Sequence, residues 1–325
     1  MRPLKTLAIL AGLVLGWNAH ATEIRIALDC PPDPAKCGSY VFAHAFAEHL
    51  KANGLSAREM PVGSIGGEAE RLDQTAQGLL EVNMADLARA AQLEKSVSAF
   101  MAPYLFDSLD HLDRSVARSD LMSRINASLS KKGVRIIALV ATGGGNGLFN
   151  VKHPIAKPED LKDLRMRALD ENQLKLFQAW GGNGVVITMP EVATAFQTGT
   201  AHGYVNAPFV PFMFGHADIL KFYTDAKVTP SLRVAMIAED WYKGLSDKDR
   251  GIVDDAAVKA LAANRAWVGP SDTAALAQLE KAGVSITRLA PESRARFRDL
   301  SRPAWTAVLN QAEIQPYIDA AEKGR

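Results

Sequence analysis

Apolar and polar positions alternate in short segments of the middle of the chain, and these segments predict its best-defined elements. Leu164–Leu169 reads LRMRAL, which predicts a strand with Arg165 and Arg167 on the face opposite the apolar residues. Apolar residues at a spacing of three then predict a helix that stops at Gly181. A β-branched run over residues 185–187 predicts a second strand. The order strand, helix, strand is typical of an α/β protein.

A further helix and strand follow directly. Pro190 suits the first turn of a helix, which we expect to end at Gly199, and residues 203–206 predict a buried strand. In open α/β sheets, ligands bind beyond the carboxyl ends of the strands. Arg167 and Asn206 lie at two such ends. The forked guanidinium of an arginine suits a carboxylate, and the amide of an asparagine can both donate and accept hydrogen bonds. The pattern alone also allows Arg167 to be a solvated strand residue.

The same rules predict elements on both sides of this region. We expect strands at Glu23–Leu28, Glu81–Leu87, Gly133–Thr142, Leu232–Ala238 and Val284–Arg288, with the fourth returning to the first part of the fold. We expect helices at Tyr40–Asn53, Glu68–Gln77, Asp110–Leu121, Ser246–Trp267, Thr273–Lys281 and Pro291–Lys323. Gly269 and Pro270 predict a kink or a break between the fourth and fifth of these helices.

Polar residues at the ends of the early strands are further candidates for a binding site. Asp29 follows the first strand, and Asp86 and Arg89 follow the next one. An acid and a base three positions apart could form one wall of a binding cleft. They could equally form an ordinary salt bridge at the start of a helix.

Two other clusters have a plain structural interpretation beside a functional one. The glycines of residues 143–147 could cradle a phosphate, but neither a P-loop nor a dinucleotide fingerprint fits, which favours a flexible crossover. Pro208, Phe209, Phe212 and Phe214 form an aromatic cluster whose default role is core packing. Phe209 lies close enough to Asn206 in sequence to line a pocket.

Three segments of the chain resemble the solute-binding proteins of tripartite ATP-independent periplasmic (TRAP) transporters, the DctP family. Residues 158–167, PEDLKDLRMR, resemble the family pattern P-x-D-L-K-G-L-K-x-R. Residues 190–199 are similar to its S-E-V-Y-x-A-L-Q-x-G helix, and residues 203–206 to its D-G-x-E-N strand end. The spacing of the three segments also fits, and the resemblance extends over nearly all of the chain after the leader.

The resemblance implies a two-lobed α/β fold of the type II periplasmic binding protein kind, with a mixed sheet flanked by helices in each lobe and a long helix between the lobes. We expect residues 22–143 and 232–268 in lobe I, and residues 144–231 and 269–325 in lobe II. It also implies that Arg167 and Asn206 bind a small carboxylate, while Asp29, Asp86 and Arg89 contact its other end.

The chain departs from the family pattern at two positions of the expected site. Family members often carry a second arginine near the position of Gly147, and an aromatic residue where this chain has Met189. Arg167 therefore remains the main candidate for an anion clamp, and a simple dicarboxylate becomes a less expected ligand. We include Gly147, Met189 and Phe209 among the expected ligand-binding residues.

The amino terminus reads as a secretory signal peptide. Arg2 and Lys5 precede an apolar run, and Ala19-His20-Ala21 matches a cleavage site after Ala21, so residues 1–21 should be removed on export to the periplasm. A retained anchor is the alternative. Without residues 1–21 the chain has 35 basic and 36 acidic residues, from 37 and 36 in the full chain, which gives no reason to expect nucleic acid as a partner.

Cys30 and Cys37 are the only cysteines and enclose a proline-rich loop. In an exported protein such a pair predicts a disulfide. A metal site is the alternative, although no histidine or second cysteine pair lies nearby.

These observations favour a periplasmic receptor that delivers a small organic acid to the small and large membrane subunits of a TRAP permease. By the resemblance we expect a monomer, and we expect no cofactor, metal or catalytic residues. An exported hydrolase is the first alternative, but no GxSxG, HExxH or Cys–His signature occurs. A receptor that serves a sensor kinase or a tripartite tricarboxylate system is the second.

Overall fold

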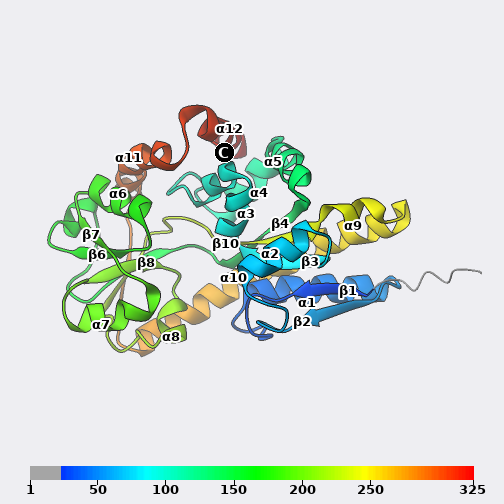
Figure 1. The fold of residues 1–325 in the computed structure, drawn as a ribbon. Helices are drawn as coiled ribbons and strands as arrows, with labels where there is room; N and C mark the ends of the chain where they lie inside the picture. The colour runs from blue at the N-terminus through cyan, green and yellow to red at the C-terminus, as the bar shows by residue number, and fades with distance from the viewer. Residues whose placement is uncertain (1–22) are drawn as a thin grey trace, which may run out of the picture.

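The computed structural model describes residues 23–325, whose strands form two separate sheets (Figure 1). The predicted leader, Met1–Ala21, lies outside the described residues. The first sheet has the order β2-β1-β3-β10-β4 and comprises β1 (Ile24–Ala27), β2 (Ala57–Met60), β3 (Val82–Asp86), β4 (Val134–Gly143) and β10 (Ser231–Ala238). The second has the order β11-β9-β5-β8-β6-β7 and comprises β5 (Gly147–Asn150), β6 (Arg165–Ala168), β7 (Asn183–Val186), β8 (Gly203–Asn206), β9 (Phe222–Asp225) and β11 (Ser285–Arg288).

Each sheet is mixed because one strand enters it from the other lobe. The chain leaves β4 in the first sheet and starts β5 in the second, and β5 pairs antiparallel with β8 and β9. It returns from β9 to β10, which pairs antiparallel with β3 and β4. The predicted return of this strand to the first part of the fold is confirmed. The two connections, residues 144–146 and 226–230, are called the crossings below.

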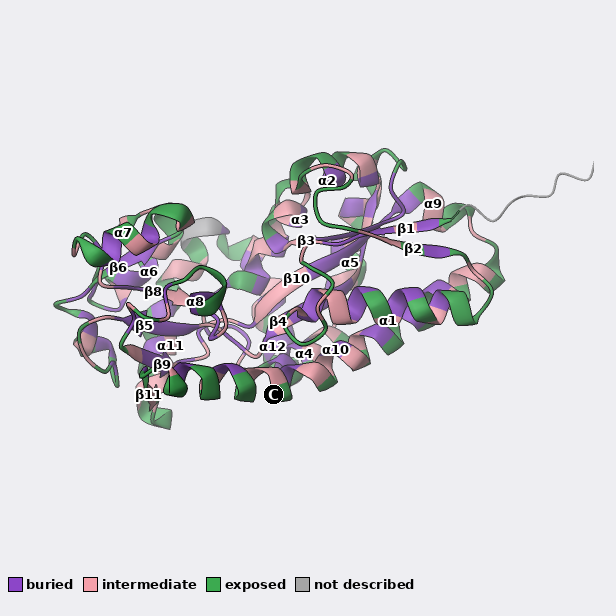
Figure 2. Ribbon diagram, turned by 90° about the horizontal axis from the view of Figure 1, so that it is seen from below, coloured by how far each residue is buried: buried purple, intermediate pink, exposed green. Residues whose placement is uncertain are grey.

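Helices cover both faces of each sheet, and the inner strands are largely buried between them (Figure 2). Lobe I, built on the first sheet, carries α1 (Gly38–Ala52), α2 (Glu68–Ala76), α3 (Leu87–Leu93), η1 (Lys95–Met101), α4 (Leu109–Ala117), α5 (Leu121–Leu129), η2 (Ser130–Lys132) and α9 (Glu239–Gly244). Lobe II, built on the second, carries η3 (Pro158–Leu161), α6 (Glu171–Ala179), η4 (Met189–Glu191), α7 (Val192–Gln197), α8 (Val210–Met213) and α11 (Pro291–Val308). The predicted two-lobed α/β fold with mixed sheets is confirmed.

The long helix α10 (Asp247–Lys281) packs along both lobes (Figure 1). Ser246 caps its first turn, as predicted, by accepting a hydrogen bond from the Asp249 N–H. Of the predicted kink or break at Gly269 and Pro270, the break is wrong, since the helix is continuous through both residues, and the kink stays a prediction. Both are exposed, so water can solvate the carbonyl that the proline leaves without its helical partner.

The carboxyl-terminal tail differs from the prediction of a single helix. It forms α11 and then α12 (Gln311–Gly324), which begins at a capping box of Asn310 and Glu313. The predicted boundaries placed all of this tail in lobe II, whereas α12 packs into the core of lobe I through Ile314 and Tyr317. The physical reason is its apolar face, which covers the helices α4 and η1.

Two smaller packing features also differ from expectation. Phe212 on α8 and Phe214 directly after it do not enter the core, since 38% and 47% of their surface is exposed. Tyr104, from the loop between η1 and α4, packs instead into the core of lobe II beside Trp180 and Phe297.

No helix among residues 23–325 is long and apolar enough to cross a membrane.

Candidate functional site

The carboxyl ends of the parallel strands in both sheets lie next to the crossings. Asn206, the last residue of β8, pairs with Gly147, where β5 starts after the first crossing. Asp86, the last residue of β3, pairs with Arg233 near the start of β10, after the second crossing. α/β proteins bind ligands at the edge of the sheet formed by the carboxyl ends of the parallel strands. In both sheets this edge faces the crossings.

Arg167 is the clearest candidate for an anion-binding side chain in lobe II. It lies in β6 opposite Tyr204 of β8, and only 4% of its surface is exposed, so the interpretation as a solvated strand residue is wrong. Its Nε donates to the Ile187 carbonyl at 2.7 Å, while neither Nη atom has a hydrogen-bond partner among the described residues. Burial lowers the pKa of the guanidinium, which means that the charge is poorly solvated. A bound anion would supply the hydrogen-bond acceptors and the opposite charge that this guanidinium lacks.

Two neighbours of Arg167 on β8 also have unused polar atoms. The Asn206 side chain makes no hydrogen bond with the residues described and is partly exposed. The hydroxyl of Tyr204 is buried without a partner, and burial raises its pKa, so it stays protonated as a donor. The strand pairing therefore brings Arg167 and Asn206 to one edge, two positions apart across adjacent strands.

The other predicted residues of lobe II differ in how far they can reach a ligand. Phe209 is partly exposed and lies next to the Gly143 end of β4. Met189 is partly buried against the core that surrounds α7. Gly147 is buried, and a Cβ there would lie 2.4 Å from both the Thr224 oxygen and the Tyr223 ring. A second arginine at this position could not be accommodated without moving the sheet.

In lobe I the predicted polar residues meet around Arg233, which was not predicted from the sequence. Its Nε lies 3.3 Å from Asp29 Oδ2, and its Nη1 lies 3.2 Å from Asp86 Oδ2 and 3.1 Å from Glu68 Oε1. Arg89 Nε joins the cluster through Glu68 Oε2 at 3.4 Å. Asp86 and Arg89 therefore have different partners, while Asp86 also caps α3 by accepting from the Ala88 N–H.

Asp29 is the least solvated acid of this cluster. Its side chain is 2% exposed, its Oδ1 has no hydrogen-bond partner, and Ser39 donates to its Oδ2 at 3.3 Å. Burial raises the pKa of this carboxyl and the charge of Arg233 opposes the rise. Behind it, the buried Arg71 donates to Asn83 and to the Met84 carbonyl. Asp29 thus helps to hold Arg233 rather than offering an exposed acceptor.

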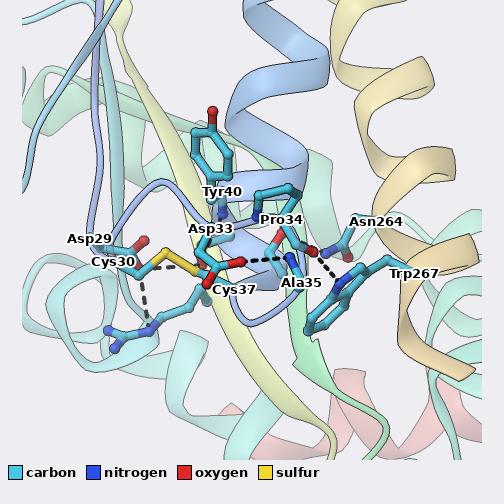
Figure 3. The surroundings of a disulfide bond; sticks show 12 residues. Asp29, Cys30, Asp33, Pro34, Ala35, Cys37, Tyr40, Asn264 and Trp267 are labelled. Atoms are coloured by element: carbon cyan, nitrogen blue, oxygen red, sulfur yellow. Dashed lines mark hydrogen bonds and ion pairs between the residues drawn. A yellow bond between two sulfur atoms is a disulfide. The ribbon is translucent and has the colours of Figure 1, made fainter. Parts of the chain in front are cut away.

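The disulfide loop forms the support beneath Asp29 (Figure 3). Cys30 and Cys37 are bonded as predicted, and the Cys37 sulfur accepts from the Tyr40 N–H at the start of α1. Trp267 of α10 donates to the Pro34 carbonyl at 2.7 Å and so ties the loop to the long helix. The sulfurs and Asp29 lie close together, but sulfurs in a disulfide offer no thiolate for a metal.

The sequence could have pointed to Arg233 through topology alone. It stands near the start of a strand that returns antiparallel into the first sheet, which places it beside the carboxyl end of β3. The local pattern carries no such information, because register depends on residues more than a hundred positions away.

Comparisons with known proteins show what the chain as a whole is similar to. The family model described as "Bacterial extracellular solute-binding protein, family 7" (DctP) matches residues 39–312. A "Solute-binding protein" of Chromohalobacter salexigens is 22% identical over 91% of this chain and 84% of its own length. The ectoine/5-hydroxyectoine-binding periplasmic protein UehA of Ruegeria pomeroyi is 24% identical over 80% of this chain and 78% of its own.

Solved structures match the fold over almost the whole chain. A TRAP periplasmic solute-binding protein of Rhodobacter sphaeroides has a TM-score of 0.85 with 19% identity, covering 93% of this chain and 99% of that one. Another from Chromohalobacter salexigens, with bound D-glucuronate, has a TM-score of 0.78 with 19% identity, covering 93% and 100%.

Proposed function

Since the chain belongs to family 7 of the bacterial extracellular solute-binding proteins, the binding subunits of TRAP transporters, we propose that it captures a small organic acid between its two lobes and delivers it to a TRAP-type permease. Arg167 binds the carboxylate in this proposal, and Asn206 hydrogen-bonds to it or to a neighbouring hydroxyl. The relatives named for ectoine and sialic acid and the structures with bound glucuronate and galacturonate support a small, polar ligand of this kind.

The observation that carries the proposal is that the two Nη atoms of Arg167 make no hydrogen bond with the described residues. A buried arginine normally has its donors satisfied, and here the two Nη atoms have no partner among residues 23–325. A carboxylate accepts two parallel hydrogen bonds from such a fork. Because these bonds are charge-assisted, they are stronger than hydrogen bonds between neutral groups.

Lobe I completes the site in this proposal. Asp86, Arg89 and Glu68 present partly exposed charged groups at the edge that faces the crossings, and Arg233 holds them together. The lobes approach each other when a ligand bridges them, because the bridged state gains contacts with both. We also propose that the protein acts in the periplasm as a monomer, with small and large permease subunits as its partners, and that it catalyses no reaction.

The test is calorimetric titration of the chain from Thr22 onward with a panel of small carboxylates, including D-glucuronate, D-galacturonate and ectoine. Arg167→Lys keeps the charge but removes the fork, so we expect a loss of affinity of about 10–100-fold, as for 1.5–3 kcal/mol of charge-assisted hydrogen bonding. Thermal unfolding with each acid gives an independent readout, because a ligand of the folded state raises the melting temperature.

Arg165→Lys is the matched control, since Arg165 lies two residues away on the same strand with its side chain exposed. Its guanidinium donates to the Gly199 and Thr200 carbonyls, away from the proposed ligand. The proposal fails if both variants keep the wild-type affinity, or if no acid of the panel binds.

A further inference from the structure

The two crossings and helix α10 converge on one side chain, Asp272. It lies on α10 with 14% of its side chain exposed, and both carboxylate oxygens accept from the Gly144 N–H at 3.0 Å in the first crossing. Lys227 Nζ, from the second crossing, lies 3.2 Å from Asp272 Oδ2. One carboxylate therefore joins all three of these connections between the lobes.

Lys227 extends this cluster back to the second sheet. Its Nζ lies 3.3 Å from Oδ1 of Asp225, the last residue of β9, whose side chain is also 14% exposed. Asn146 and Thr229 pair the crossings with each other next to it, through a backbone bond of 2.9 Å and a side-chain bond of 2.9 Å. The crossings are thus joined to each other as well as to α10.

The backbone has an unusual conformation or an unusually close contact at two residues of this cluster. Lys227 has a φ of 48°, in the left-handed region that residues other than glycine, asparagine and aspartate rarely adopt. At Gly144 a Cβ would lie 2.2 Å from Asp272 Oδ2, so any other residue would require the carboxylate to shift away from the crossing. Conformations of this kind persist where surrounding contacts over-determine them.

Two features next to this cluster would allow α10 to move: a cavity and a proline inside the helix. A cavity of about 260 Å³ lies between the start of α4 and α10 and includes Gly144 and Gly269 in its lining. Pro270 cannot donate the helical hydrogen bond at its position, so α10 is easiest to bend just before Asp272, where it contacts the crossings.

We infer that Lys227 and Asp272 form a latch that fixes the angle between the lobes. With the latch intact, α10 cannot shift against either crossing without separating a partly buried ion pair and the Gly144 N–H bond. Without it, the crossings are free to reorient as a hinge while α10 bends near Pro270. The latch residues would thereby control the lobe arrangement on which any ligand that bridges the lobes depends.

The experiment measures the distance between the lobes without any ligand, by pulsed electron–electron resonance on spin labels at Lys51→Cys and Lys175→Cys. These residues are exposed on α1 and α6, in different lobes, and the native cysteines are both in the disulfide. Lys227→Asn removes the ion pair, and asparagine tolerates the left-handed backbone. Asp272→Asn removes the charge but keeps an acceptor for Gly144. We expect each to broaden the distance distribution or shift it by more than about 2 Å.

The matched control lies on the same helix within lobe I. Lys259 and Asp255 form an ion pair of 2.9 Å on the surface of α10, so Lys259→Asn and Asp255→Asn remove the same groups without touching a crossing. Their distributions should equal the wild-type one. The latch is refuted if Lys227→Asn, checked as folded by circular dichroism, has the wild-type distribution, or if the control pair changes it equally. Because no ligand is used, this result is independent of the proposed function.

Discussion

Several buried polar side chains of lobe II end in atoms without a hydrogen-bond partner among the described residues, and two of them, Tyr204 and His216, lie near Arg167. The hydroxyls of Tyr204 and Tyr223 and Nδ1 of His216 belong to this group. Their rings pack against Phe149 and Phe196, and those of Tyr204 and His216 also pack against each other, so aromatic packing holds them in place. Tyr204 and His216 thus offer polar atoms near Arg167 at the cost of unsatisfied hydrogen bonds.

His216 makes the stability of the protein depend on pH. Burial, followed by the nearby charge of Arg167, lowers its pKa, so the folded protein keeps the ring neutral where the unfolded chain takes up a proton. Stability that is fully present above the unfolded pKa of about 6.5 is therefore lost as the pH falls toward the lower folded value, by up to about 1.4 kcal/mol per pH unit.

Urea unfolding of the wild type and His216→Phe at pH 7.5, 6.5 and 5.5 tests this dependence. The variant keeps an aromatic ring and loses no hydrogen bond with the described residues, because neither ring nitrogen of His216 has one. We expect the free energy of unfolding of the wild type to fall below pH 6.5 relative to that of the variant. Parallel curves would mean that His216 titrates normally in the folded protein.

At the scale of elements, local pattern was sufficient where each strand and helix carries its own signals. β8 has the predicted bounds of residues 203–206, and α6 ends before Gly181, which has the left-handed φ of 80° that the predicted stop requires. The local sequence pattern was insufficient where contacts between residues far apart in the chain determine the structure. α10 continues through Pro270, and Arg233 reaches Asp29 and Asp86 only because β10 returns beside β3.

Gly147 shows how packing between elements limits the site. Its strand β5 pairs with β9, and a Cβ added at Gly147 would meet ring carbons of Tyr223 and the Thr224 carbonyl oxygen. We expect Gly147→Ala to lower the free energy of unfolding by about 3 kcal/mol, the upper end for overpacking in a core. An arginine placed here would disrupt the sheet before it could add a second anion clamp.

The same substitution at an open position is the control for Gly147→Ala. Gly251 lies inside α10, and a Cβ added there would have no neighbouring atom within 4 Å, so Gly251→Ala should stabilise the helix by about 0.5–1 kcal/mol. Urea unfolding measures both variants. A Gly147→Ala protein as stable as the wild type would show that β5 and β9 separate easily, and that the missing arginine has another cause.

For the whole molecule, the carboxyl-terminal tail links the lobes in a way that its sequence did not reveal. It leaves lobe II at α11 and ends in lobe I, where His111 bonds the Ala321 carbonyl at 2.7 Å and Arg114 donates to Gly324 at 2.8 Å. The helix α12 can be recognised from its pattern, but the lobe to which it docks depends on which apolar surface remains uncovered.

Tyr317 is the residue that tests this docking. It is 2% exposed, packs edge-on against Phe100 at 5.2 Å, and its hydroxyl has no partner. Tyr317→Ala should therefore lower the free energy of unfolding by about 3–5 kcal/mol, as for other large aromatic side chains, whereas Tyr317→Phe should change it little. Hydrogen exchange locates the effect: in Tyr317→Ala the amides of β4 and β10 should lose protection before those of β6 and β8. Loss of protection first in the second sheet would instead place the tail's stabilising contacts in lobe II, and would mean that α12 is held to lobe I only weakly.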